Sequence, residues 1–592
     1  MNIYSHSKLK NLKFSTHQNI IVTGDIEGNT QRIKDSISYD KESGVDLSVF
    51  PETAISGYMC GSLWDREDFV KEQARKIYEI KSFIETIRYK GAVIVGFVDF
   101  LGLKTNGYPH LKNAVALIKA DMAPQIYHKQ LLASADHHED KKYFDRGDET
   151  KVFTLDLPNT GPIKIGVPIC EDAWYTDHSR NIAEEMVAEG AELIVHINQS
   201  YFYYGKQEKR KKLLAYLSNK IKTPIISVNA LGIGDIVKNI IIFDGGSMVF
   251  DHKGRLVSVG ERFKEYKKIE TLSKLDTVQT SFYGKYTEII EAIVFEQKQF
   301  FSLMGLEKAQ VHVSGGLDSA IVAALAVMAM GKENVVLISN PTDLNSDSIK
   351  YVHYLEKKLG VKVYWDRLQM VFDVFMSENH ISFPDKELSL TGQASVQATL
   401  RTVQGLAASH RFGTGIIATG NHTEIVLGWA SFHDIGSIGV HAIIGDLTKT
   451  ELYQLAQNLN AVFFEDEVIP EDLYNGVFKP AAELPDAKED PIDYALQSGI
   501  CALLIRNRMS KTDLVEGFAE KNEEIFTYDL FPEQDYLWSK SVNDIKEQVE
   551  WASDRMKKSV YKAAQSAPIV IISPRSRGFS NREVLINKYK EK

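Results

Sequence analysis

The sequence predicts an α/β protein built from at least two domains, and three observations support this prediction. The chain has 592 residues, enough for two to four domains at about 150 residues each. Short β-branched and aromatic runs alternate with helical patterns up to about residue 265. A strand, a glycine-containing loop, an Ala-rich helix and a second strand then follow one another over 311–339, which is how a parallel sheet begins.

Composition excludes several classes of protein. The 69 Lys and Arg against 79 Asp and Glu give a net charge of −10, which argues against a nucleic-acid binder. Three scattered cysteines are too few for a disulfide framework or a Cys-rich zinc site. The N-terminus has no apolar run typical of a secretory signal, and the longest uncharged apolar stretch, 320–331, is far shorter than the ~20 residues that span a bilayer. We expect a soluble, cytoplasmic protein with no membrane partner.

The first predicted domain covers residues 1–270. Buried strands are predicted at 92–100, 164–170, 192–200 and 224–230, and helices at 66–87 and 177–190. The segment 245–260 alternates apolar and polar residues around turn residues, so we predict a hairpin that closes this domain.

A charged linker at 271–285 separates this domain from the second, at 286–592. Its helical pattern at 286–305 ends in Gly. A strand at 311–313, a helix at 320–330 and a strand at 334–339 follow, and a region rich in Pro and acidic residues at 465–491 is predicted to be a loop.

Glu52, Lys129 and Cys170 each follow an apolar run in the first domain. A thiol that attacks an amide carbonyl needs a base for its proton and a cation near the developing oxyanion, and these three residue types supply both. Backbone N–H groups next to Cys170 are expected to lower the pKa of its thiol. The alternative for each residue alone is structural: a buried thiol, a surface carboxylate and a solvated lysine.

These contexts, FPE at 50–52, YHK at 127–129 and ICED at 169–172, resemble the nitrilase family of carbon–nitrogen hydrolases, specifically the glutaminase domains of glutamine-dependent NAD synthetases. The resemblance implies an αββα sandwich in which Glu52 is the general base, Lys129 stabilises the tetrahedral intermediate and Cys170 is the nucleophile. It implies glutamine contacts at Tyr58, Glu171, Ser200 and Lys206. One departure is Ala135, where the family usually has an aromatic residue.

The loop Ser-Gly-Gly-Leu-Asp-Ser at 314–319 lies between a strand and a helix. Gly315 and Gly316 let the backbone approach a pyrophosphate, the helix N-terminus adds partial positive charge, and Asp318 is a candidate ligand for Mg²⁺. The G-x-x-x-x-G-K-[ST] pattern is absent, so cleavage at the α-phosphate is expected rather than γ-phosphoryl transfer. The alternative is an ordinary turn in which Asp318 caps the helix.

Together with TGNHTE at 419–424, this loop resembles the ATP-pyrophosphatase domain of NAD synthetases. The resemblance implies a doubly wound, Rossmann-like parallel sheet that binds ATP and Mg²⁺ and amidates nicotinic acid adenine dinucleotide through an adenylate. The implied ATP contacts are His312, Val313, Ser314, Gly315, Gly316, Leu317, Asp318, Ser319 and Thr419. The implied dinucleotide contacts are Ser395, Glu424, Lys449 and Lys562, with Asp318 and Glu424 as metal ligands. Each lysine could instead be a solvated surface charge.

Some positions depart from that family. Residues 394–399 read ASVQAT where the family has approximately E-N-x-Q-A-R, His422 replaces a Lys, and 562–565 read KAAQ rather than K-R-R-Q. The sequence therefore predicts an ATP-dependent amidotransferase that uses glutamine and nicotinic acid adenine dinucleotide or a related acid. A nucleotide sensor with a degenerate synthetase site and a stand-alone amidase are the alternatives. The resemblance also implies a homo-oligomer, a dimer of synthetase domains or an octamer.

Two charged segments are predicted to have no function. HHED at 137–140 lacks the i, i+4 spacing of a helical metal site, so we predict a loop. The basic run at 206–212 opens a helix and, apart from Lys206, is predicted to be its solvated face.

Overall fold

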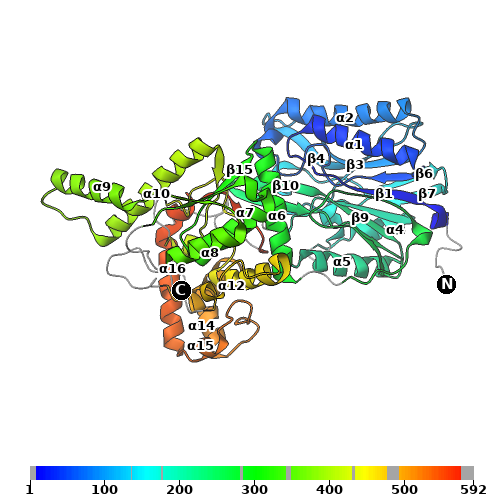
Figure 1. Cartoon of the computed structure of the whole chain (residues 1–592). Coiled ribbons are helices and arrows are strands. Elements are labelled where there is room, and N and C mark those ends of the chain that lie inside the picture. Colours follow the sequence, from blue (N-terminus) through cyan, green and yellow to red (C-terminus); the bar gives the residue numbers. More distant parts are fainter. Residues whose placement is uncertain are drawn as a thin grey trace. The chain divides into compact units, whose positions relative to one another are not determined.

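The computed structural model describes residues 8–134, 137–174, 178–280, 284–341, 348–429, 434–475 and 492–574. The chain forms two compact units (Figure 1). The first contains Met1–Ile236 and Ile241–Phe282, and the second contains Val237–Ile240 and Tyr283–Lys592. Among the described helices, none combines the length and apolar character needed to cross a bilayer.

The first unit is the expected αββα sandwich, with two sheets of six strands. One sheet has the order β14-β1-β2-β3-β4-β5, and the other has the order β13-β12-β9-β8-β7-β6. The strands of the first sheet are β1 (Lys13–Gln18), β2 (Leu47–Val49), β3 (Ala92–Leu103), β4 (Pro109–Ile118), β5 (Gln125–His128) and β14 (Tyr266–Thr271). Those of the second are β6 (Val152–Leu157), β7 (Gly161–Gly166), β8 (Leu193–Asn198), β9 (Ile225–Asn229), β12 (Met248–Phe250) and β13 (Leu256–Val259).

Helices cover both outer faces of this sandwich. Helices α1 (Ile26–Glu42) and α2 (Glu67–Thr86) cover one sheet, while α4 (Ile182–Ala188) and α5 (Lys206–Ile221) cover the other (Figure 1). The apolar core between the sheets includes Phe14, Ile94, Phe153 and Ile194, all fully buried. All six residues of β8 are buried, as expected for a parallel strand covered on both faces. The predicted hairpin is β12 paired antiparallel with β13.

The second unit contains a parallel sheet with the order β17-β16-β15-β18. Its strands are β15 (Lys308–His312), β16 (Val335–Ser339), β17 (Val363–Trp365) and β18 (Thr414–Ile416). Because β15 has the next strand in sequence, β16, on one side and the much later β18 on the other, the strand order reverses at β15. Ligands of doubly wound sheets bind in the crevice at such a reversal, outside the carboxyl ends of the strands.

Helices surround this sheet and extend the unit. They are α6 (Lys285–Leu303), α7 (Leu317–Met330), α8 (Ile349–Leu359), α9 (Gln369–Ser382), α10 (Leu390–Phe412), α11 (His422–Leu427), α12 (Lys449–Asn458), α13 (Tyr494–Ile505), α14 (Lys511–Ala519), α15 (Gln534–Trp538) and α16 (Val542–Ala563). Helices α13 to α16 share a separate apolar core that includes Leu496, Phe518 and Phe531. Helix α7 begins three residues earlier than predicted, so Asp318 lies in its first turn. Part of the predicted 465–491 loop, 476–491, lies outside the described residues.

The first two residues of β11 (Asn239–Asp244) pair with β19 (Ile569–Val570) within the second unit, and β10 (Leu231–Ile236) precedes β11 along the chain. Asn239 and Ile240 pair in parallel with Ile569 and Val570, which explains why Val237–Ile240 belongs to the second unit. No sequence pattern indicated this pairing, because it joins positions more than 300 residues apart.

Candidate active sites

Glu52 and Lys129 form a buried ion pair in the first unit. Glu52 follows β2, and Lys129 follows β5 directly. Glu52 Oε1 accepts hydrogen bonds from Lys129 Nζ at 2.8 Å and Asn113 Nδ2 at 2.7 Å. Its other oxygen, Oε2, accepts from the N–H of Gln199 at 2.7 Å. Glu52 and Lys129 are each 1% exposed, so the surface-charge alternative for both is excluded.

Asp140 is a second carboxylate on Lys129 that the sequence analysis missed. Its Oδ2 lies 2.8 Å from Lys129 Nζ, and its Oδ1 accepts from the Tyr58 hydroxyl at 2.6 Å. Burial opposes the charge on Lys129, but Asp140 and Glu52 outweigh it and raise its pKa well above the usual value. The interpretation of HHED as a loop without a role was therefore wrong for Asp140, which begins the short helix α3 (Asp140–Tyr143).

Cys170 begins a 3₁₀ turn, Cys170–Ala173, that follows β7. Its φ of 45° lies in the left-handed region, which is costly for a residue with a side chain. The side chain of Asp172 fixes this turn. Its Oδ1 accepts hydrogen bonds from the N–H groups of Gln130 and Leu131. Its Oδ2 accepts hydrogen bonds from the N–H of Ile169 and from the hydroxyl of Tyr127. One buried carboxylate thus ties the turn that carries Cys170 to the segment directly after Lys129.

The expected lowering of the Cys170 pKa was wrong. Burial raises the pKa of the thiol well above its usual value, and the charge of Glu52 adds to this, with Lys129 only partly opposing. Cys170 is 4% exposed, so few water molecules can stabilise a thiolate. The resting thiol is therefore protonated, and a nucleophilic attack requires a nearby base. Glu52 is the carboxylate whose charge acts most strongly on it.

Three of the predicted glutamine contacts, Tyr58, Glu171 and Lys206, lie within electrostatic reach of Cys170, and the fourth, Ser200, follows Gln199, which donates to Glu52. Lys206 begins α5 with its ammonium above the rings of Trp174, at 4.4 Å, and Tyr203, at 4.9 Å. Burial, with Arg210 next, lowers the pKa of Lys206 to about 8, and the charges of Cys170 and Glu171 also act on it. Glu171 Oε1 contacts His178 Nε2 at 2.9 Å. Ser200 is 2% exposed, and Tyr58 lies within electrostatic reach of Cys170.

Arg210 corrects the prediction for the basic run at 206–212. Its side chain is 4% exposed and forms a buried ion pair with Asp244. Arg210 lies one helical turn after Lys206, so both point to the same side of α5. The sequence of this basic run gives no sign of the ion pair, because the partner of Arg210, Asp244, lies 34 residues later.

In the second unit, the loop at 314–319 joins β15 to α7 at the reversal of strand order. Gly315 has a φ of 86°, and a Cβ there would lie 2.3 Å from the carbonyl oxygen of Ser348, so only glycine fits. The loop is also closed internally: Ser319 Oγ accepts from the N–H of Ser314 at 3.2 Å, and Ser314 Oγ accepts from that of Gly316 at 3.3 Å. Leu317 and Val313 are buried beside it.

Asp318 joins this loop to the TGNHTE segment. Its Oδ1 accepts from Lys449 Nζ at 2.7 Å, and its Oδ2 accepts from Asn421 Nδ2 at 2.9 Å. Burial opposes the charge of Lys449, but Asp318 and then Glu424 raise its pKa well above the usual value. Lys449 is 7% exposed, so it is not a solvated surface charge. Tyr494 donates to Glu424 Oε1 at 3.2 Å.

His312 lies at the end of β15, held in one protonation state. Burial lowers its pKa to about 4, so the ring is neutral. Its Nδ1 lies 2.8 Å from Asn340 Oδ1, which can only accept, so Nδ1 carries the proton. Its Nε2 then accepts from Gln310 Nε2 at 2.9 Å.

The remaining predicted nucleotide and dinucleotide contacts lie on three elements. Thr419 follows β18, the neighbour of β15, and is half-buried. Ser395 is exposed on α10, where its carbonyl accepts from the Thr399 hydroxyl. Lys562, on α16, donates to the carbonyl of Gly428 at 3.1 Å. Neither of these two hydrogen bonds involves the group around Asp318.

Asp318 and Glu424 are the candidate metal ligands of the second unit. Within the part of the chain that the structure describes, no group of three or more His, Cys, Asp and Glu side chains is arranged to hold a metal ion. Mg²⁺ is commonly held by one or two carboxylates completed by substrate phosphates and water. Asp318 and Glu424 both lie within electrostatic reach of Lys449, and their carboxylates are of the kind that Mg²⁺ prefers. The donor set therefore fits Mg²⁺ bound together with a phosphate ligand.

Comparison with known proteins gives consistent results for both units. Residues 15–273 match the carbon-nitrogen hydrolase family, and residues 289–527 match the NAD synthase family. A glutamine-dependent NAD(+) synthetase of Thermotoga maritima is 27% identical over 98% of this chain and 100% of its own length. One from Synechocystis is 27% identical over 84% of this chain and 89% of its own.

Solved structures of two further glutamine-dependent NAD(+) synthetases have the same fold. The Cytophaga hutchinsonii protein has a TM-score of 0.76 at 16% identity, covering 98% of both chains. The Acinetobacter baumannii protein, solved in complex with adenosine diphosphate, has a TM-score of 0.70 at 24% identity, covering 98% of this chain and 99% of its own.

Proposed function

Because the chain belongs to the carbon-nitrogen hydrolase family through residues 15–273 and to the NAD synthase family through residues 289–527, we propose that it is a glutamine-dependent NAD synthetase. The observation that carries this proposal is the buried group of Glu52, Lys129 and Cys170 in a chain that also has an ATP-type loop at 314–319. The substrates are glutamine, ATP and nicotinic acid adenine dinucleotide.

The first unit releases ammonia. Cys170 Sγ attacks the side-chain amide carbon of glutamine while Glu52 accepts the thiol proton, which suits a thiol that is protonated at rest. Lys129, kept cationic by Asp140 and Glu52, stabilises the oxyanion. Glu52 returns the proton to the departing nitrogen, leaving a glutamyl thioester. Water activated by Glu52 then hydrolyses the thioester to glutamate.

The second unit uses this ammonia. The carboxylate of the dinucleotide attacks the α-phosphorus of ATP and pyrophosphate leaves, giving an adenylate. Ammonia attacks the acyl carbon and AMP leaves, forming the amide. The loop at 314–319 and the N-terminus of α7 bind phosphate oxygens, although the N–H groups of Ser314 and Gly316 are used within the loop. Asp318 and Glu424 would hold Mg²⁺, which when bound neutralises charge on the pyrophosphate leaving group.

The direct test is product stoichiometry. With glutamine, ATP, Mg²⁺ and nicotinic acid adenine dinucleotide, the chain should form NAD, AMP and pyrophosphate in equal amounts. The altered segment at 394–399 favours one second candidate, an amidotransferase for a related acid, so other carboxylic acids belong in the same assay. AMP formed only with another acid would reassign the substrate, and nucleotide binding without AMP from any acid would indicate a sensor.

Asp140→Asn is expected to lower the rate of glutamine hydrolysis by about 10²-fold. The change removes one of two charges that hold Lys129 in place and keep it protonated, while an amide retains the volume. Initial rates of glutamate release measure this effect. Ammonium-dependent synthesis should remain within twofold, and an unchanged glutamine rate would contradict a role for Asp140 in positioning Lys129.

We also propose that the chain is a homo-oligomer and that the apolar face of α9 contacts a second copy. In this helix of 14 residues only Phe372 is buried, and Met370, Val374 and Ile381 are 74%, 60% and 67% exposed. An amphipathic helix is normally stabilised by packing of its apolar face.

The three free, buried cysteines, Cys60, Cys170 and Cys501, suit the reducing cytoplasm, which we propose as the compartment.

A double change, Met370→Glu with Val374→Glu, is expected to disrupt the contact between two copies. The mass of the oligomer should then fall to half or less. Two carboxylates buried in an apolar contact would cost several kcal/mol. Light scattering coupled to size-exclusion chromatography measures the mass. Tyr78→Glu on α2, where the side chain is 62% exposed, is the control and should leave the mass unchanged. An unchanged mass for the double variant would exclude α9 as the interface.

A further inference from the structure

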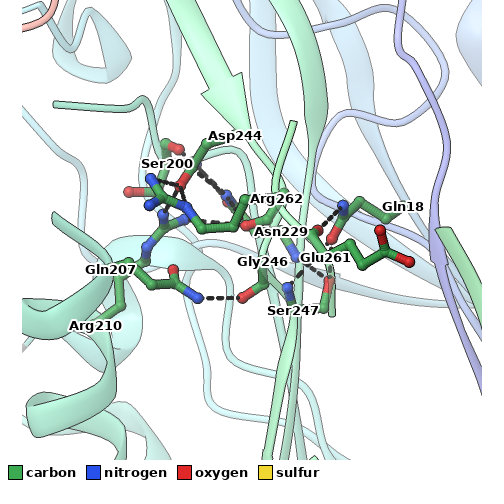
Figure 2. A network of polar contacts seen from close by, with 11 residues as sticks. Gln18, Ser200, Gln207, Arg210, Asn229, Asp244, Gly246, Ser247, Glu261 and Arg262 are labelled. Atoms are coloured by element: carbon green, nitrogen blue, oxygen red, sulfur yellow. Dashed lines mark hydrogen bonds and ion pairs between the residues drawn. The ribbon is translucent and has the colours of Figure 1, made fainter. Parts of the chain in front are cut away.

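Asp244 is a buried carboxylate shared by two buried arginines (Figure 2). It ends β11 and is fully buried, and the side chains of Arg210 and Arg262 are 4% and 6% exposed. Oδ1 accepts from Arg210 Nη2 at 2.6 Å, and Oδ2 accepts from Arg262 Nε at 3.0 Å and Nη2 at 2.8 Å. Burial opposes its charge, but the two guanidinium groups outweigh burial and lower the pKa of Asp244. The group therefore carries one negative and two positive charges.

Asn229 connects this group to Ser200, as Figure 2 shows. Its Oδ1 accepts from the N–H of Ser200 at 3.0 Å, and its Nδ2 donates to Gly245 O at 2.9 Å and to Asp244 Oδ1 at 3.3 Å. With these donors and acceptors only one orientation of the amide is consistent. Gln199, the neighbour of Ser200, donates its N–H to Glu52, so the segment that Asn229 holds also touches the candidate base.

Arg210 connects the same group to Lys206, one turn earlier on α5. After burial, Arg210 is the largest influence that lowers the pKa of Lys206. The other charged or titratable groups around Lys206 are Lys209 on α5, Cys170 and Glu171 from the 3₁₀ turn, and Tyr201 and Tyr203 from the segment before α5. Glu171 and Cys170 act in the opposite direction to Arg210. Asp244 is the carboxylate that pairs with Arg210.

We propose that Asp244 is a positioning residue for glutamine: through Asn229 it places Ser200, and by pairing with Arg210 and Arg262 it sets the positive charge next to Lys206. This inference rests on the proposed glutaminase function. Asp244, which is remote from Cys170 in sequence, would then control the affinity for glutamine and not the rate of the chemical step. Glutamine carries an α-carboxylate, which a cationic Lys206 attracts and a neutral Lys206 does not.

The test is the pH dependence of the KM for glutamine in the full chain. In the unaltered protein, KM should rise as pH increases through about 8, because Lys206 then loses its proton. Asp244→Asn leaves two guanidinium charges without their carboxylate, so the rise should begin on the order of one pH unit lower. At pH 8, a shift of that size lowers the cationic fraction of Lys206 from about one-half to about one-tenth, so KM should increase about fivefold while kcat changes less than about twofold.

Arg210→Met should move the rise in the KM for glutamine to higher pH, because it removes a positive neighbour of Lys206. Asp244 still has its ion pair with Arg262 in this variant. A purely structural role would not shift the two variants in opposite directions. Asp251→Asn is the matched control, since Asp251 is also buried and paired with an arginine, Arg255, at the β12–β13 turn. Its pH profile should match that of the unaltered protein.

Ammonium-dependent synthesis and a cooperative thermal transition establish that each variant is folded. If Asp244→Asn does not fold, the direction of the Arg210→Met shift decides the matter alone. Identical KM profiles for Arg210→Met and the unaltered protein would overturn the proposal. An unaltered protein that releases no glutamate at any pH would instead overturn the proposed function.

Discussion

Cys170→Ala is expected to abolish NAD formation from glutamine, with a loss of at least about 10⁴-fold, while synthesis from ammonium persists. The thiol is the only group in the proposed scheme that forms a bond to glutamine, and alanine leaves no nucleophile. The second unit has its own buried group around Asp318 and Lys449, which the change does not touch. Parallel assays with glutamine and with ammonium chloride measure both outcomes.

Cys60→Ala is the matched control for this experiment. Cys60 is a buried thiol in the same unit, 5% exposed, and burial raises its pKa to about 12. Both nitrogen sources should support synthesis in that variant. Persistence of glutamine-dependent synthesis in Cys170→Ala would show that Cys170 is not the nucleophile, and loss of synthesis from ammonium as well would show that the two activities are not separable.

Asp318→Asn is expected to have the reverse effect. Synthesis from both nitrogen sources should fall by about 10³-fold, because the change removes a carboxylate proposed for Mg²⁺ and the strongest ion-pair partner of Lys449. Glutamate release from glutamine should continue. Assays of pyrophosphate, NAD and glutamate on one sample distinguish these activities.

An exposed aspartate of the same unit provides the comparison. Asp554→Asn on α16 makes the same Asp-to-Asn change at an exposed position. Its rates of synthesis should stay within about twofold of those of the unaltered protein. If Asp318→Asn retained full synthesis from ammonium, the phosphate-binding interpretation of the loop at 314–319 would be wrong.

The sequence predicted those strands that are buried on both faces, such as β8 and β9. Such strands appear as continuous apolar runs, as in Leu193–Asn198, and need no knowledge of partners. The loop at 314–319 could be predicted for a related reason, since strand, glycines and helix follow one another locally. Helix α7 begins earlier than the predicted residue 320 because Leu317, Asp318 and Ser319 of that loop already have helical backbone.

The parts that could not be predicted depend on contacts between distant positions. Asp140 and Arg210 looked unremarkable in sequence because their roles arise from Lys129 and Asp244. The direction of the Cys170 pKa depended on how completely the folded sandwich excludes water, which neighbouring residues do not specify. Local patterns indicated the candidate reactive residues, and only the fold showed which residues contact them.

Strand β11 restricts how the two activities can be isolated. Its first residues, Asn239 and Ile240, form backbone pairs with Ile569 and Val570, yet they lie in the middle of the chain segment that builds the sandwich. A fragment truncated at residue 280 would lose those pairs and expose a strand edge, a common starting point for aggregation. Glutaminase activity is therefore better separated from synthetase activity by point substitution than by truncation.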